Sequence, residues 1–344
     1  MKVVILILNF NGRDHLDGCL ESLAAQSLAP DKIAVFDNGS NDGSINLVRE
    51  KYPQVALLAH EKNLGFAEGN NRGISWIREN LNSEFIVLLN NDTKPEVDWL
   101  ARLVEALGAD SSLGSASSCM LYASDGGPIN NAGDMPLWDG AGIARGRYQA
   151  SEAFCADAEV FGACAGAAIY RSKALDEVAM DGRVFDPRYF AYNEDVDLSW
   201  RLRKRGWGCR YGAGARVVHH HAATGGRYSL WVLFHGERNR CWTLLKNFSW
   251  WLILVSPLYT LCRFVAVAAG LGKRGSGGGT AAGYRARSSI ASIVWTILKA
   301  WASALLGAPC MLSKRWKYRL GWSFRRQTDV FKRFGAKLGQ AAGH

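Results

Sequence analysis

The chain has 344 residues, enough for one large domain with an appendage or for two domains. Its eight cysteines form no Cys-x-x-Cys pair or metal-ligand spacing, and nothing at the N-terminus resembles a secretory signal, which excludes a disulfide-built secreted protein and predicts a reduced, cytoplasmic one. The net charge of +10 arises mainly after Arg201, so we expect an anionic partner, nucleic acid or anionic lipid, for the C-terminal end.

Four short apolar segments in the N-terminal part are expected to be β-strands. The first, residues 3–8, is a continuous run rich in β-branched residues, typical of a strand covered on both faces in a parallel sheet. The others cover residues 33–36, 55–58 and 85–89. Each is followed by a polar loop and a segment with helical spacing. The sequence therefore predicts an α/β domain with a doubly wound, mostly parallel sheet flanked by helices.

The polar loops after these strands contain the candidate ligand-binding side chains. Because parallel strands end at one edge of a sheet, where open α/β folds bind ligands, we expect the loops to converge there. Asp37, at the end of the second strand, either caps a helix or accepts hydrogen bonds from a nucleoside. The first turn lacks the Gly-x-Gly-x-x-Gly pattern of dinucleotide-binding proteins. The binding candidates in these loops are Asn9, Asn11, Asp37, Asn63, Arg72, Asn91 and Asp92.

Asp92 and His219 are the candidate metal ligands. Asp92 completes an Asn-Asn-Asp sequence after the fourth strand, which is either an ordinary turn or a site where a carboxylate binds Mg²⁺ or Mn²⁺ together with a diphosphate. Residues 219–221 are three histidines at the end of another predicted strand. They either form a loop cluster or supply a nitrogen to the same metal, although imidazole suits Mn²⁺ less well than carboxylate does.

The segment 123–158 is rich in Gly, Ala, Asp and Asn and has little periodicity, so we expect a long surface excursion that acts as a mobile lid.

Glu194, Asp195 and Asp197 lie within four positions at the start of a predicted helix. Free N–H groups and the helix dipole stabilise anions in a first turn, so we expect all three carboxylates to be ionised. They form either an acidic helix cap without chemistry or a site where one carboxylate is a general base at the rim of a pocket. For Asp197 we expect a capping role worth about 1 kcal/mol.

The C-terminal third has the composition of a membrane-associated segment. The thirteen tryptophans concentrate there, and Trp favours the headgroup interface. Two apolar stretches, 250–270 and 290–312, are separated by a Gly-rich linker and interrupted by Pro257, Arg263 and Lys299, which favours in-plane or re-entrant helices over a transmembrane hairpin. The tail 314–326 alternates cations with aromatics, and after such helices we expect it to bind anionic headgroups rather than single-stranded nucleic acid.

Five motifs occur together and in order, and together they resemble the inverting family-2 glycosyltransferases, closest to the bacterial rhamnosyltransferase-like branch that builds polysaccharide on lipid carriers. The resemblance covers roughly residues 1–245. The motifs are Asn9-Phe-Asn-Gly12, Asp37-Asn-Gly-Ser-Asn-Asp-Gly-Ser44, Asn63-Leu-Gly-Phe-Ala-Glu-Gly-Asn-Asn71, Leu89-Asn-Asn-Asp92 and Glu194-Asp-Val-Asp-Leu-Ser199.

The resemblance implies the GT-A fold and a catalytic domain over residues 1–247, with the helices and basic tail of 248–344 associating with membrane. It also implies that Asp37 contacts the donor nucleoside, that Asp92 binds the metal, and that Asp195 is the catalytic base with Glu194 beside it. The family's Asp-x-Asp motif begins with Asn90 here, which favours a second metal ligand such as His219.

The implied activity is transfer of a sugar, with rhamnose a candidate, from a dTDP- or UDP-activated donor to a hydroxyl of a lipid-linked saccharide. The implied cofactor is Mg²⁺ or Mn²⁺, and the implied setting is bacterial cell-surface polysaccharide synthesis. We expect a peripheral or monotopic protein on the cytoplasmic face of the inner membrane, bound to anionic lipids and not to nucleic acid. The alternatives are a polyprenyl-phosphate sugar synthase and a non-catalytic protein that binds sugar nucleotides or nucleic acid.

Overall fold

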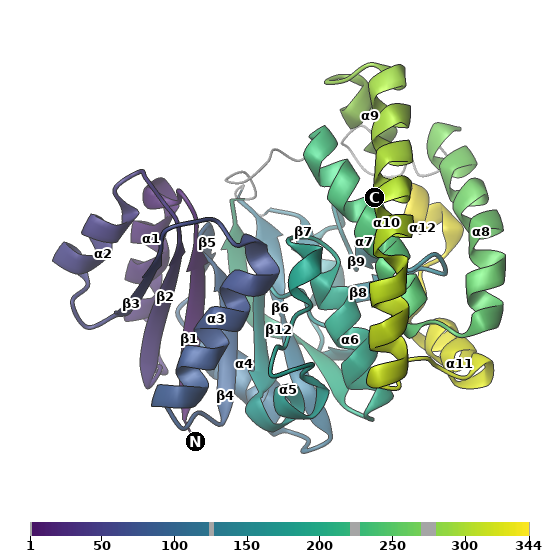
Figure 1. Ribbon diagram of the computed structural model, residues 1–344. Helices are drawn as coiled ribbons and strands as arrows, with labels where there is room; N and C mark the ends of the chain where they lie inside the picture. Colours follow the sequence, from purple (N-terminus) through teal and green to yellow (C-terminus); the bar gives the residue numbers. More distant parts are fainter. Residues whose placement is uncertain (1, 124–126, 221–227, 270–279, 344) are drawn as a thin grey trace.

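The computed structural model in Figure 1 describes residues 2–123, 127–220, 228–269 and 280–343. His221 and the Gly-rich linker 271–279 lie outside the described residues.

The central sheet confirms the predicted α/β architecture. Its strand order is β10-β12-β6-β11-β4-β1-β2-β3, with β5 paired to β12 and β7 paired to β6. The four predicted N-terminal strands are parallel neighbours in it, and β11 is the antiparallel member between β4 and β6. The strands are β1 (Val3–Asn9), β2 (Lys32–Asn38), β3 (Ala56–His60), β4 (Phe85–Asn90), β5 (Thr93–Pro95), β6 (Leu113–Tyr122), β7 (Ile129–Asn131), β10 (Ala158–Glu159), β11 (Ala167–Arg171) and β12 (Gly208–His219).

Helices cover both faces of this sheet, because alternate side chains of the strands are apolar on both sides. In β1, Val4 and Leu6 belong to one core while Ile5 and Ile7 belong to the other. Helices α3 (Gly65–Asn80), α5 (Ser172–Val178) and α6 (Glu194–Lys204) cover the first face, and α1 (Arg13–Ala24), α2 (Ser44–Lys51) and α4 (Trp99–Gly108) cover the second. Both faces of the sheet are therefore buried beneath its loop-bearing edge.

The expectation of a surface excursion over 123–158 is wrong for the described part of that segment. It contains β7 and a small antiparallel pair, β8 (Asp134–Pro136) and β9 (Gly142–Ala144), and several of its residues are completely buried, including Ile129, Ala132 and Asp139. Strands of three residues are too short to show periodicity, which is why the sequence pattern resembled a loop.

The described residues of the C-terminal third form six helices, of which the long α10 packs along α7. In Figure 1 these helices gather at one side of the sheet, and α9 lies beyond its upper edge. The first of these helices is α7 (Leu230–Asn247). The others are α8 (Trp250–Ala268), α9 (Thr280–Arg285), α10 (Ile290–Lys317), α11 (Phe324–Phe334) and α12 (Leu338–Gly343).

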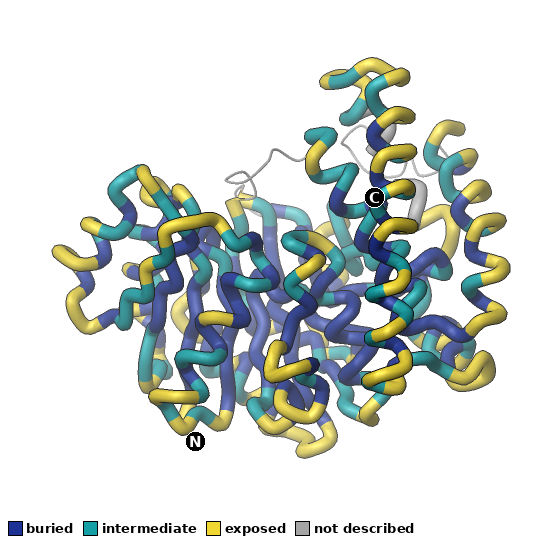
Figure 2. Tube along the Cα trace, in the orientation of Figure 1, coloured by how far each residue is buried: buried dark blue, intermediate teal, exposed yellow. Residues whose placement is uncertain are grey.

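Helices α8 and α10 are each long and apolar enough to cross a membrane, by length and composition alone. Their outer faces carry exposed apolar side chains, and Figure 2 shows exposed positions along both helices. The cation that interrupts α8 does not face outward. Arg263 instead lies 2.7 Å from Asp139 and 3.0 Å from Glu237 of α7, so it holds α8 against the rest of the molecule.

Candidate active site

A cleft of about 780 Å³ opens at the carboxyl ends of the parallel strands. Of the predicted site residues, it brings together Asn63, Asn91, Asp92, Glu194, Asp195 and His219. Asn9, Asn11, Asp37 and Arg72 are not part of its lining. The cleft continues from these polar residues to a second wall formed by α7, α8, α9 and α10.

Asn9 and Asp37 form a buried support beneath the cleft. Asn9 Nδ2 donates to Asp37 Oδ2 at 2.8 Å, and Asn91 Nδ2 donates to Asn9 Oδ1 at 2.7 Å. The second carboxylate oxygen of Asp37 accepts the backbone N–H of Ser40 at 2.9 Å. Asn11 orders the same loops from outside, since its Oδ1 accepts the backbone N–H of Asn41. These side chains fix the loops that carry Asn91 and Asp92.

The Asn63 loop is shaped by hydrogen bonds and by one glycine. Asn63 Oδ1 accepts Asn38 Nδ2 at 3.0 Å and the backbone N–H of Gly65 at 2.8 Å. Gly65 has φ +79°, and a Cβ there would lie 2.6 Å from the Phe190 carbonyl oxygen, so only glycine fits. Arg72 lies further along α3, where its side chain is 59% exposed and pairs with Glu68.

Asp92 and His219 meet because β5 pairs with β12. That antiparallel pairing sets His219 opposite Thr93, and it brings His219 Nε2 to 3.2 Å from Asp92 Oδ1. Burial by itself raises the pKa of Asp92, but the hydrogen bond and charge of His219 outweigh it and hold the pKa below its usual value. One carboxylate oxygen and one imidazole nitrogen therefore converge at the cleft. This donor pair fits a divalent ion that takes its other ligands from phosphate and water.

The turn before the predicted catalytic pair is strained. Phe190 has φ 63° and ψ −65°, and the Ala191 N–H donates to the Tyr189 carbonyl at 2.8 Å, which makes a rare γ-turn. The next left-handed residues are Tyr192 and Asn193, at φ 72° and 70°. Each such residue costs roughly 1–3 kcal/mol, so surrounding structure must hold the turn in place.

Helix α7 holds this turn through one buried side chain. Asn239 Nδ2 lies within 2.9 Å of the carbonyl oxygens of Tyr189, Ala191 and Tyr192. Asn193 is fixed in the same way, since its Nδ2 donates to Thr243 Oγ1 of α7 at 2.8 Å. The turn therefore presents the next two residues, Glu194 and Asp195, to the cleft at the start of α6.

Two of the three carboxylates that we expect to be ionised have pKa values above the ordinary ones. Burial raises the pKa of Asp195, and it raises that of Glu194 well above normal, with the neighbouring Asp195 charge adding to the effect. Burial and the charge of Asp195 likewise raise the pKa of Asp134, which faces the same cleft. Desolvation therefore exceeds the stabilisation from the first helix turn.

Glu194 and Asp134 each leave one carboxylate oxygen without a protein partner. Both residues are only 6% exposed, yet Glu194 Oε2 and Asp134 Oδ2 have no hydrogen-bond partner within the described part of the chain. Buried polar atoms are nearly always paired, so these two oxygens are available to groups that enter the cleft. The carboxylates of both residues interact electrostatically with Asp195.

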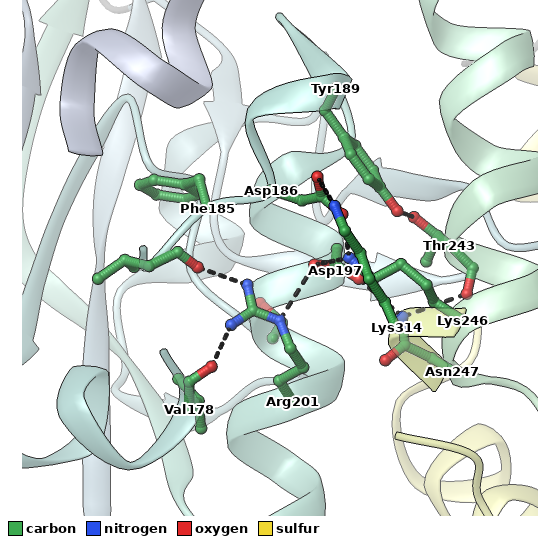
Figure 3. A network of polar contacts seen from close by, with 12 residues as sticks. Val178, Phe185, Asp186, Tyr189, Asp197, Arg201, Thr243, Lys246, Asn247 and Lys314 are labelled. Carbon is green, nitrogen blue, oxygen red and sulfur yellow. Dashed lines mark hydrogen bonds and ion pairs between the residues drawn. The ribbon is translucent and has the colours of Figure 1, made fainter. Parts of the chain in front are cut away.

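Asp197 has a different role from the one predicted. Its side chain does not cap α6; it accepts Lys246 Nζ at 3.0 Å, Arg201 Nε at 3.1 Å and Asn247 Nδ2 at 2.8 Å. Figure 3 shows Lys246 between Asp197 and Asp186, and Lys314 reaching Asp186 at 2.6 Å. We call this set, Asp186, Asp197, Arg201, Lys246 and Lys314, the buried charge network. It joins α6, α7 and α10.

Asp134 and Asn239 are site residues that the sequence did not reveal. Asp134 lies in the segment interpreted as a loop, and Asn239 lies inside a helix between Arg238 and Arg240. Neither belongs to a motif with recognisable spacing. The sequence feature that could have identified Asn239 is a polar residue on the buried side of a helix. No sequence feature identifies Asp134.

The comparisons with known proteins agree with this geometry. The model of glycosyl transferase family 2 matches residues 4–179. An N-acetylglucosaminyl-diphospho-decaprenol L-rhamnosyltransferase of Mycobacterium tuberculosis is 26% identical over 270 residues, which cover 72% of this chain and 85% of that protein. A cholesterol galactosyltransferase of Borreliella burgdorferi is 27% identical over 114 residues, covering 32% of this chain and 30% of that protein.

Two solved structures share the fold. GalNAc-T7 with UDP, GalNAc and Mn²⁺ superposes with a TM-score of 0.61 at 13% identity, over 97% of this chain and 58% of that one. The mannosyltransferase PcManGT of Pyrobaculum calidifontis with GDP-Man and Mn²⁺ gives a TM-score of 0.52 at 16% identity, over 89% of this chain and 86% of that one.

Proposed function

The chain belongs to glycosyl transferase family 2 and has the GT-A fold, and from that premise we propose that it transfers a sugar from a nucleotide-diphosphate donor to a hydroxyl of a lipid-linked saccharide, with inversion at the sugar C1. The observation that carries this proposal is the single cleft that contains both the Asp92–His219 pair and Asp195. A phosphate-binding end and a carboxylate base in one cleft are the two parts that a direct displacement needs.

Asp195 is the proposed base. The acceptor hydroxyl attacks C1 of the donor sugar, the C1–O bond to the nucleoside diphosphate breaks, and the hydroxyl proton passes to the Asp195 carboxylate. The Asp195 side chain is only partly buried and reaches the cleft, where it remains accessible to an acceptor. Asn239 is a positioning residue for Asp195, because Asn239 holds the strained turn that precedes Asp195.

Glu194 and Asp134 are proposed to hold the acceptor sugar. Their unpartnered oxygens are suited to accept hydrogen bonds from hydroxyl groups next to the one that reacts. Such bonds would orient the acceptor while leaving the Asp195 carboxylate free for the proton.

Asp92 and His219 are proposed to bind Mg²⁺ or Mn²⁺ at the donor end. When bound, this ion neutralises the negative charge that gathers on the departing diphosphate. Asn91 and Asn63, which line the same part of the cleft, are proposed to contact the donor. Asp37 and Asn9 support these loops from beneath.

The acceptor class is inferred from the relative of M. tuberculosis, whose name describes a rhamnosyltransferase acting on a sugar that is joined through a diphosphate to decaprenol. We infer an acceptor of the same chemistry here, with rhamnose as the leading sugar and dTDP or UDP as its carrier. The apolar outer faces of α8 and α10 support a peripheral or monotopic position on the cytoplasmic face of a bacterial inner membrane, with residues 248–344 as the membrane-associated part.

A donor screen tests this function. The full chain is incubated with a prenyl-diphosphate-linked GlcNAc and with dTDP-rhamnose, UDP-GlcNAc, UDP-galactose or UDP-glucose in turn, and the products are analysed by mass spectrometry. We expect the mass of the acceptor to increase by one sugar residue with one of these donors. If sugar appears only on free prenyl phosphate, the acceptor assignment is wrong.

Replacing Asp92 by alanine is expected to abolish divalent-ion-dependent donor binding, since Asp92 supplies the only carboxylate of its turn. Calorimetric titration of nucleotide sugar in the presence and absence of Mn²⁺ measures the effect. Glu96→Ala is a suitable control, because Glu96 pairs with Arg216 at the surface and does not line the cleft. Equal metal-dependent affinity in Asp92→Ala and the parent protein would exclude Asp92 as a ligand.

A further inference from the structure

The cleft does not end at the catalytic carboxylates. It continues into a groove whose walls are apolar side chains from three C-terminal helices. We call it the apolar groove, and its lining includes Trp231 and Val232 of α7, Phe264 and Val267 of α8, and Ile293 and Ile297 of α10. An apolar lining that is continuous with the proposed sugar-transfer site is suited to an apolar group attached to the substrate.

Two of the cations that line this end of the cleft are paired with carboxylates. Arg240 and Arg263 both line it, but Arg240 lies 2.6 Å from Glu237 and Arg263 lies 2.7 Å from Asp139. The positive charges of Arg240 and Arg263 are therefore balanced by the negative charges of these two carboxylates. The groove is therefore suited to a neutral hydrocarbon chain.

Arg147 and Arg285 are two further cations of the cleft lining, and Arg147 comes from the segment that also carries β8 and β9. Arg147 lines the cleft, and its Nε donates to the Tyr122 hydroxyl at 3.1 Å, but no carboxylate lies within ion-pair distance of it in the described ranges. The charge of Arg147 also affects Tyr284, a residue of the cleft lining in α9. Burial raises the pKa of Tyr284 in α9 to about 12, and the positive charge of Arg147 opposes that rise.

We propose that the apolar groove binds the prenyl chain of the lipid-linked acceptor and that Arg147 binds its diphosphate. This inference rests on the proposed function. The cleft contains the three kinds of group that such an acceptor needs: carboxylates for the sugar, the Arg147 cation for the diphosphate, and apolar walls for the chain.

The apolar groove is distinct from the outward faces of the same helices. Leu258 of α8 and Leu305 of α10 are 67% and 74% exposed and do not line the cleft, whereas Val267 and Ile293 do. Contact with a membrane surface needs only the outward set. The inward set is accounted for by a chain that leaves the bilayer and enters the protein between α8 and α10, so that the lipid stays covered while its sugar reaches Asp195.

Two acceptors with the same saccharide and diphosphate test the proposal, one carrying a long prenyl chain and one carrying a single isoprene unit, both in detergent with the full chain. Since burying hydrocarbon is favourable, we expect kcat/KM to be at least about ten-fold higher for the long chain. Val267→Asn and Ile293→Asn should lower kcat/KM for the long-chain acceptor, so that the ratio of kcat/KM for the long and short acceptors falls toward one. Arg147→Gln should raise KM for both acceptors equally.

Leu258→Asn and Leu305→Asn are the matched controls. They should keep the preference for the long chain and reduce sedimentation with vesicles of phosphatidylcholine and phosphatidylglycerol. Equal use of the two acceptors by the parent protein overturns the groove assignment without needing any variant, and so does an unchanged preference in both groove variants. If the parent protein transfers sugar to neither acceptor, the proposed function itself fails.

Discussion

Replacing Asp195 by asparagine is expected to slow sugar transfer by roughly 10²- to 10⁴-fold while donor affinity persists. Asparagine has nearly the same volume and retains an oxygen for the Val196 N–H that Asp195 accepts at 2.8 Å, but it cannot take the acceptor proton. Because burial raises the pKa of Asp195, the parent enzyme should lose activity as the pH falls through that raised value. The variant should lack this acidic limb.

Single-turnover transfer, normalised to the folded fraction, measures the effect, and calorimetry with the nucleotide sugar measures donor affinity. Glu194→Gln is the companion variant, and a smaller loss is expected from it because its oxygen only holds the acceptor. A folded Asp195→Asn enzyme with full activity would falsify the base assignment and direct attention to Glu194 or Asp134.

Replacing Lys246 by methionine is expected to lower the free energy of unfolding by about 3–5 kcal/mol. Lys246 Nζ lies 2.9 Å from Asp186 and 3.0 Å from Asp197, and all three side chains are 0% exposed. The variant leaves two buried carboxylates short of a cation that water cannot replace. Part of the loss is the burial cost of those carboxylates, so the figure is not the net strength of the ion pairs.

Denaturant titration of both proteins measures this difference. Lys317→Met is the matched control, because Lys317 forms an exposed pair with Asp181 at 2.7 Å and its loss should cost at most about 1 kcal/mol. Equal midpoints for the Lys246 variant and the parent would contradict the structural role of the buried charge network.

The pH dependence of that difference follows from the two aspartates. Burial by itself raises the pKa of Asp186 and Asp197, but the Lys246 charge, together with Lys314 for Asp186 and Arg201 for Asp197, outweighs it and lowers both values. The stability they contribute is therefore fully present above the unfolded-state pKa of about 3.9 and is lost as the pH falls toward their folded values. The difference in the free energy of unfolding between the parent protein and Lys246→Met should therefore become smaller at acidic pH.

Much of the fold could be predicted from the sequence because its signals are local. The run of β-branched residues in β1 and the polar loops after β2 and β4 identify parallel strands, and the start of α6 lies at Glu194 as its acidic residues indicate. The role of Asp197 could not be predicted, because its partners Lys246 and Asn247 are 49 and 50 residues away. The apolar groove was equally hidden, since inward and outward apolar residues of α8 and α10 look alike in sequence.

The contact between Lys314 and Asp186 has a consequence for the synthesis of the protein, because the acceptor site can form only after Lys314 has been translated. The chain emerges from its N-terminus, so the sheet, Asp92 and Asp195 are made first. Asn239 of α7 holds the strained turn, and Lys246 of the same helix contacts Asp186. Asp186 is in turn bound by Lys314 of α10, which is translated 128 positions after it. A ribosome-bound chain stopped before α10 should therefore contain every catalytic group and still bind acceptor poorly, which pulldown of stalled nascent chains on an immobilised prenyl-diphosphate saccharide can measure.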